Sequence, residues 1–184
     1  MIISKIKDIC KAAKRIIITR TECVQWISDG YSTYPLYNVP ELSRENVFAI
    51  FDIPEDKQSG FQFDERDCIG DGILLSDEHD GELPLTLLST EIKAYGVTLA
   101  VAKSESGVIF INKRYLAPFA DFENGVQLYE RRGRSGQPYI AVKDGMFLFG
   151  LILPAPVDNA VFGEELLEIG RLAKIRAESD NSCK

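Results

Sequence analysis

Basic side chains near the start of the chain have the types and spacing to contact phosphates. Between residues 4 and 15, apolar residues recur at the spacing of one helical face, and Ser4 is the expected N-cap. The opposite face then collects four cations, Lys7, Lys11, Lys14 and Arg15. Five basic residues and one acidic residue give this segment a net charge of +4, in a chain whose total is −7. The face is either simply solvated or placed to bind a nucleic-acid backbone by displacing its condensed counterions.

Acidic side chains concentrate between residues 41 and 82, where 13 acidic and 3 basic residues give a net charge of −10. Carboxylate clusters can hold Ca²⁺ or Mg²⁺, so one alternative is a small metal-dependent enzyme that uses the acidic 64–82 segment. The run at 77–82 (DEHDGE) lacks the glycine and glutamate spacing of a calcium-binding loop. A solvated loop is the favoured interpretation, and no metal ligands are assigned.

Catalytic motifs are missing from the sequence. His79 is the single histidine, there is no nucleophile elbow or phosphate-binding loop, and no acid–base pair stands out. The four cysteines (Cys10, Cys23, Cys68, Cys183) form no C-x-x-C pair, which favours free thiols in a reducing compartment over a zinc site. We therefore expect a protein that is not an enzyme and needs no cofactor.

Composition sets the outer limits of the fold and the compartment. A chain of 184 residues with 45% hydrophobic and 27% charged residues is long enough for one domain with a sizeable core. No apolar run approaches the roughly 20 residues of a bilayer-spanning helix, and the first residues lack the pattern of a signal peptide. These absences lead us to expect a cytoplasmic protein with no membrane partner.

The pattern of the chain predicts an α+β fold with antiparallel sheets and short helices. A hairpin is expected over 16–27, a helix capped by Ser43 over 44–51, and strands at 61–63 and 91–102. From Gly107 onward a strand at 108–111 leads into a short helix at 113–122, which Pro118 must kink or break. Three antiparallel strands then follow, at 126–131, 138–142 and 146–153. After Pro156 an apolar stripe and ordered charges predict a terminal helix over about 163–178.

The motifs IFINKRYLAPF, VQLYERR, QPYIAVKDG and MFLFGLILP, in this order, resemble the last half-domain of the bacterial replicative sliding clamp (beta-clamp) family. The earlier VQWISDGYSTYPL is similar to that family's strand running into an aspartate-glycine turn. The resemblance covers about residues 1–156. Pro118 departs from the pattern, and this chain has room for one domain where the family's chains carry three.

The resemblance implies a clamp-like domain over 1–157, with a C-terminal helix and tail over 158–184 as an addition. In that family both helices of each domain line the DNA channel. This implies that Lys113 and Arg114 of the second helix join the cations of the first. The expected DNA-binding residues are therefore Lys7, Lys11, Lys14, Arg15, Lys113 and Arg114.

The expected function is that of a non-enzymatic DNA-replication accessory that contacts the DNA backbone through its basic N-terminal helix. The expected partners are double-stranded DNA without sequence specificity, further copies of the chain that assemble through sheet edges, and replication proteins. Besides the metal-dependent enzyme, one more alternative is a clamp-fold protein-interaction module that does not encircle DNA.

Overall fold

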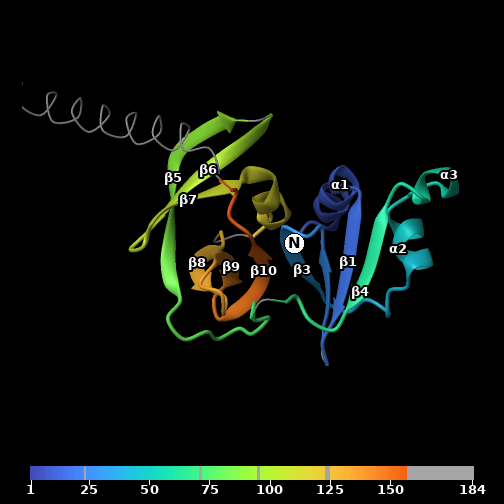
Figure 1. The fold of residues 1–184 in the computed structure, drawn as a ribbon, viewed down its shortest axis with the longest axis horizontal. Helices are drawn as coiled ribbons and strands as arrows, with labels where there is room; N and C mark the ends of the chain where they lie inside the picture. Colours follow the sequence, from blue (N-terminus) through green and yellow to red (C-terminus); the bar gives the residue numbers. More distant parts are fainter. Residues whose placement is uncertain (23, 71, 95, 123–124, 157–184) are drawn as a thin grey trace, which may run out of the picture. The chain divides into compact units, whose positions relative to one another are not determined.

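The computed structural model describes residues 1–22, 24–70, 72–94, 96–122 and 125–156, and shows an α+β fold (Figure 1). A mixed, mostly antiparallel sheet of ten strands carries a few short helices. The helices are α1 (Ile3–Ala13), α2 (Arg44–Ile50), α3 (Glu55–Gln58) and the 3-10 helix η1 (Lys113–Phe119). The strands are β1 (Arg15–Arg20), β2 (Gln25–Ser28), β3 (Ser32–Leu36), β4 (Gln62–Arg66), β5 (Leu83–Ala94), β6 (Val97–Ser104), β7 (Gly107–Asn112), β8 (Gln127–Arg132), β9 (Pro138–Asp144) and β10 (Phe147–Ile152).

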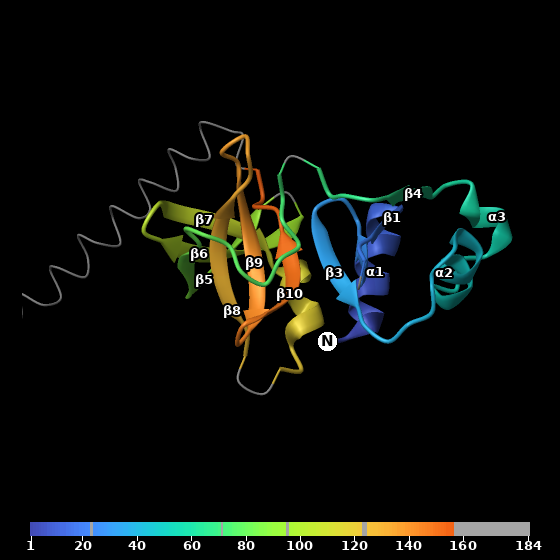
Figure 2. The same ribbon diagram turned by 90° about the horizontal axis from the view of Figure 1, so that it is seen from below.

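The same unit, a helix followed by three antiparallel strands, occurs twice in the chain. The first copy is α1–β1–β2–β3 and the second is η1–β8–β9–β10. The strand order β4-β1-β2-β3-β10-β9-β8-β5-β6-β7 places the two copies back to back. They join where β10 pairs antiparallel with β3, with Leu151 opposite Thr33 and Ile152 opposite Ser32. Figure 2 shows these two strands side by side at the middle of the sheet.

Both helices of the repeated units pack on one face of the sheet, which we call the helix face. Ile6, Ile9 and Cys10 of α1 and Tyr115 and Phe119 of η1 are buried in one cluster with the sheet. The two helices contact each other, and the amide of Ile2 donates a hydrogen bond of 2.7 Å to the carbonyl of Pro118.

A glycine permits the close approach of η1 to the sheet. A Cβ at Gly150 of β10 would lie 2.6 Å from Cζ of Phe119, which is inside any normal contact distance. The ring of Phe119 packs against Tyr34, with 5.6 Å between the ring centroids. Any side chain at Gly150 would therefore push η1 away from the point where the two units join.

The acidic segment 67–82 crosses the opposite, outer face of the sheet and has no regular structure among its described residues. Ile69, Ile73 and Leu75 of this segment cover Trp26 and Tyr139 of the sheet. Their packing forms a second, smaller apolar cluster.

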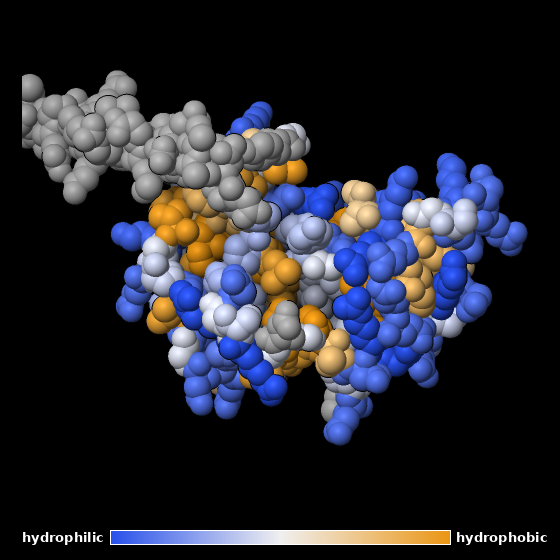
Figure 3. Space-filling view, in the orientation of Figure 1, coloured by the Kyte–Doolittle hydropathy of each residue, from blue (hydrophilic) through white to orange (hydrophobic). Residues whose placement is uncertain are grey.

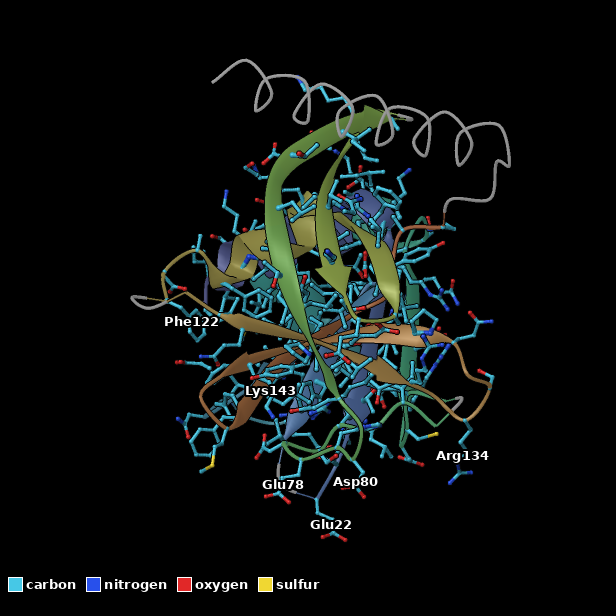
Figure 4. All side chains as sticks on the ribbon, turned by 90° about the vertical axis from the view of Figure 1, so that its left-hand side faces the viewer. Glu22, Glu78, Asp80, Phe122, Arg134 and Lys143 are labelled. Atoms are coloured by element: carbon cyan, nitrogen blue, oxygen red, sulfur yellow. The ribbon has the colours of Figure 1, made fainter. Side chains whose placement is uncertain are left out.

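Fully buried Arg131 holds the acidic segment against the sheet. It donates hydrogen bonds to the carbonyls of Ser76 and Asp77, at 2.9 and 3.0 Å, and it pairs with Glu82 at 2.8 Å. Lys143 of β9 reaches the other oxygen of Glu82 at 2.9 Å. Figure 4 shows Glu78 and Asp80 pointing away from the sheet, whereas Glu82 is paired with Arg131 and Lys143. Only some of the acidic side chains of this segment therefore face solvent.

Most of the expected elements are confirmed. The predicted order of a strand at 108–111, a short helix and three consecutive antiparallel strands corresponds to β7, η1, β8, β9 and β10. Ser43 caps α2 as predicted, in a reciprocal arrangement with Asn46. Pro118 lies inside a 3-10 helix, which accommodates the missing amide without a regular α-helix.

Two expectations about the elements were wrong. Ser4 does not cap α1, because the helix begins at Ile3 with Ile2 at the N-cap position. The predicted strand at 91–102 is two strands, β5 and β6, since Gly96 with φ +75° allows a turn between them. The strand expected at 61–63 is present as β4 at Gln62–Arg66, and its parallel pairing with β1 is a long-range contact with no local signal.

Some expectations fall outside the described residues. These are the C-terminal helix at about 163–178, the remainder of the 158–184 segment, and the thiols of Cys23 and Cys183. Of the described cysteines, Cys10 is buried and Cys68 is exposed, and both are free thiols.

The contacts of Glu82 predict a pH-dependent stability. Burial alone would raise the pKa of Glu82, but the hydrogen bonds from Lys143 and Arg131 lower it below the ordinary 4.5. A lowered folded-state pKa stabilises the fold fully above the unfolded-state pKa, and this stabilisation is lost as the pH falls through the folded-state value. Glu82→Gln should therefore lower the free energy of unfolding at neutral pH by about 1–3 kcal/mol and flatten its decline in acid.

Urea unfolding at neutral pH and across the acid range measures both effects. Glu78→Gln is the control, because Glu78 is exposed and points away from the sheet. If Glu82→Gln and wild type lost stability in parallel below pH 4.5, the role given to Glu82 would be wrong.

Candidate nucleic-acid interface

Two of the predicted DNA-binding residues on α1 reach toward the end of α2. Lys7 forms an ion pair with Asp52, and its hydrogen bond lowers the pKa of that carboxyl group. Nζ of Lys11 donates a hydrogen bond of 3.1 Å to the carbonyl of Phe51. Lysines at the carboxyl end of a helix satisfy carbonyls that have no partner within it. These cations therefore tie α1 to α2 in the free protein.

Lys14 and Arg15 do not continue the face of α1, contrary to the predicted helix over 4–15. Lys14 adopts a left-handed conformation with φ 50° and ends the helix, so its exposed side chain leaves at a new angle. Arg15 is the first residue of β1, and its Nη2 lies 3.7 Å from Asp64 of β4. The helix ends at Ala13, two residues earlier than predicted, so helical spacing does not group Lys14 and Arg15 with Lys7.

Lys113 and Arg114 open η1, whose first turn is capped by Asn112. Lys113 forms an ion pair with Glu91 of β5. The guanidinium of Arg114 lies over the ring of Tyr115 at 4.8 Å, and its Nη2 is 2.7 Å from the Tyr115 hydroxyl and 3.6 Å from Oδ2 of Asp29.

The structure thus brings α1 and η1 together but gives most of their cations a partner within the protein. Of the six predicted residues, only Lys14 has no ion pair or side-chain hydrogen bond among the described residues; on α1, Lys5 is likewise exposed without one. The carboxylates of Asp52 and Glu91 are 79% and 44% exposed. Exposed ion pairs contribute only about 0–1 kcal/mol, so a phosphate can compete with them for the lysines.

Asp29, which the sequence indicated only as part of a tight turn, is a buried carboxylate between the helices and the sheet. Its Oδ1 accepts hydrogen bonds from the amides of Tyr31 and Ser32 and from the Ser32 hydroxyl, at 2.8–3.0 Å. Its Oδ2 is buried without a hydrogen bond and faces Arg114. Asp29 also affects a neighbouring group. Burial is the main cause that raises the pKa of the Cys10 thiol, and the negative charge of Asp29 raises it further.

A pocket on the outer face is a second candidate site, which we call the outer-face pocket. It has a volume of about 170 Å³ and lies between β1, β2, β3 and β10 and the start of the acidic segment. Ile17, Tyr139 and Leu151 form part of an apolar lining, and Tyr31, 53% exposed, stands at its rim. The sequence did not reveal this pocket because its walls come from segments far apart in the chain.

The acidic 64–82 segment, which was considered for a metal site, brings together no cluster of metal-ligating side chains in the part of the chain that the structure describes. No group of three or more His, Cys, Asp or Glu side chains is arranged there to hold a metal ion. The carboxylates of Asp64 and Glu65 contact arginines instead, and the ring of His79 packs edge-on against Tyr139. None of the described helices has the length and apolar character needed to cross a membrane.

Asp29→Asn tests the contribution of the buried carboxylate. The amide group would place a donor or an uncharged oxygen before Arg114 and weaken the hydrogen bonds to the turn, with an expected loss of about 1–3 kcal/mol in the free energy of unfolding. Urea unfolding at neutral pH measures the change. Asp8→Asn on the exposed side of α1 is the matched control and should stay within about 0.5 kcal/mol of wild type. Equal stability of the two variants would remove Asp29 from this role.

Comparisons with known proteins leave the family open: no family model, no curated protein sequence and no solved structure matches this chain.

Proposed function

We propose that this chain is a non-enzymatic accessory of DNA replication whose clamp-like domain contacts the DNA backbone through the helix face. The repeated unit of one helix and three antiparallel strands supports this proposal, because both helices lie next to each other on one face of a shared sheet. This arrangement agrees with what the resemblance to sliding-clamp half-domains implies, namely two helices per domain facing DNA.

The charges of the helix face favour contact with phosphates at short range. Exposed Lys5 and Lys14 are available directly, and Lys7 and Lys113 become available when a phosphate replaces an exposed carboxylate. The total charge of −7 repels DNA at long range, so binding by one copy should be weak. Contacts of this kind carry no sequence information. Assembly of several copies would add their contacts along one DNA molecule.

A salt titration of DNA binding tests the proposal. Wild type should bind duplexes of unrelated sequence equally, and the triple variant Lys7→Glu/Lys11→Glu/Lys14→Glu should bind more weakly with a flatter salt dependence. Each lost phosphate contact lowers the slope of log affinity against log salt by about 0.9. Fluorescence anisotropy with a labelled duplex measures the slope.

The matched control is Lys57→Glu/Lys103→Glu/Arg134→Glu, which makes the same charge change at exposed positions outside α1 and η1. If this control weakened binding as much as the helix variant, the effect would be one of total charge. If wild type bound no DNA at low salt, the proposal would fail.

The outer-face pocket favours a second candidate function, that of a protein-interaction module which does not encircle DNA. Its apolar floor and the buried hydroxyl residues Thr19, Ser28 and Thr33 suit an apolar side chain of an extended peptide together with its polar backbone. The engagement of Lys7, Lys11 and Arg114 inside the protein agrees with this alternative.

Peptide selection tests the second candidate. Wild type should enrich peptides with a shared apolar residue from a displayed peptide library, and Tyr31→Asp should weaken their binding by about tenfold or more, as expected for an aromatic residue at a binding pocket. Tyr37→Asp is the control, since Tyr37 is also exposed but lies outside the outer-face pocket. Enrichment of no peptide, or equal losses in the two variants, would argue against the pocket as a binding site.

A further inference from the structure

The two edges of the sheet differ in how well they resist pairing with another strand. β4, with the sequence QFDER, ends one side of the sheet and carries Asp64, Glu65 and Arg66. β7, with the sequence GVIFIN, ends the other side and carries no charge. Figure 3 shows the same contrast, with hydrophobic surface gathered toward the β5–β7 end and hydrophilic surface at the end that holds α3. Charged side chains protect an edge from unwanted pairing, and β7 lacks this protection.

The turn between β6 and β7 determines which backbone groups of β7 point outward. Ser104 pairs with Gly107 across a loop of two residues, so these two exchange hydrogen bonds. Because such pairs alternate along an antiparallel ladder, Gly107, Ile109 and Ile111 bond to β6. The amides and carbonyls of Val108, Phe110 and Asn112 then point away from it. The side chains of Ile109 and Ile111 are buried, and that of Val108 is 55% exposed.

Apart from the carbonyl of Asn112, which as the N-cap of η1 accepts the first bond of that helix, these outward groups have no other backbone partner in the part of the chain that the structure describes. No backbone hydrogen bond outside the helices and strands involves the amides of Val108, Phe110 or Asn112. Their side chains lie on the face of β7 opposite to the buried Ile109 and Ile111, because successive residues of a strand alternate between faces. Val108 and Phe110 thus offer apolar contacts beside unpaired backbone groups.

We infer that β7 pairs antiparallel with β7 of a second copy of this chain, in a dimer with twofold symmetry. With Phe110 opposite Phe110 of the second copy, Val108 lies opposite Asn112, and the outward groups of all three residues meet in register. The two Phe110 side chains form an aromatic cross-strand pair. This inference concerns an assembly surface and does not depend on DNA binding.

A second copy fits β7 better than β4 of another copy does. Pairing β7 with itself places no charged residue of either strand opposite another, whereas β4 would bring Asp64, Glu65 and Arg66 against an apolar strand. A twofold axis perpendicular to the sheet also leaves the helix faces of both copies on the same side. The dimer would therefore present two pairs of helices on one surface, without closing a ring.

Val108→Pro tests the inference through the outward amide of Val108. Proline removes the amide of Val108, which points away from β6, so the ladder within one copy keeps its hydrogen bonds. Sedimentation velocity over a concentration series should show wild type moving from the mass of one chain toward that of two, and Val108→Pro should raise the dissociation constant by about tenfold or more. Val108→Thr, which keeps the amide and the β-branched shape, should assemble like wild type.

Hydrogen exchange locates the contact and covers the case in which the proline variant does not fold. In wild type, the amides of Val108, Phe110 and Asn112 should become protected as the protein concentration rises, while those of β4 should not. Val108→Lys, which places a charge on the edge, should abolish this protection, and Gln62→Lys on β4 should preserve it. A wild type that stays monomeric, assembles into rings of three or more copies, or leaves these three amides unprotected would overturn the inference.

Discussion

The antiparallel contact between β3 and β10 is the constraint on which the rest of the structure depends. It spans only two registered pairs, extended by a hydrogen bond of 2.8 Å from the amide of Leu153 to the carbonyl of Tyr31. Because this contact between two strands is so short, it needs support from both repeated units. Asp29 supplies it by fixing the turn before β3, and the Tyr34 hydroxyl supplies it by donating to the Tyr115 carbonyl at 3.0 Å.

Electrostatics in this protein serves the fold before it serves any ligand. Arg131 and Lys143 hold the acidic segment on the outer face, and Lys7 and Lys11 hold α1 to α2. The buried contacts of Arg131 are costly to break, because either partner would be left without its hydrogen bonds. The exposed pairs of the helix face are weak and exchangeable. The same kinds of residues are therefore structural on one face of the sheet and open to competition on the other.

The sequence predicts elements whose signals are local and misses those that arise from distant pairing. The α+β class, the Ser43 cap and the strands after η1 follow from periodicity and turn residues. The parallel pairing of β4 with β1, the burial of Asp29 and the outer-face pocket depend on contacts between distant residues. The cations at 7–15 were identified correctly by type, but spacing alone could not show that Lys14 ends the helix and Arg15 begins a strand.

The turn at residues 28–32 connects the two candidate functional surfaces. Gly30 and Tyr31 line the outer-face pocket. The side chain of Asp29, in the same turn, faces Arg114 on η1. A change at Asp29 or Arg114 therefore alters both surfaces and cannot distinguish a DNA-binding role from a peptide-binding role. Lys7 on α1 and Tyr31 at the pocket rim each belong to one surface only. Because the sheet separates them, the effects of changing these two residues should add independently, and their separate consequences decide which surface carries the function.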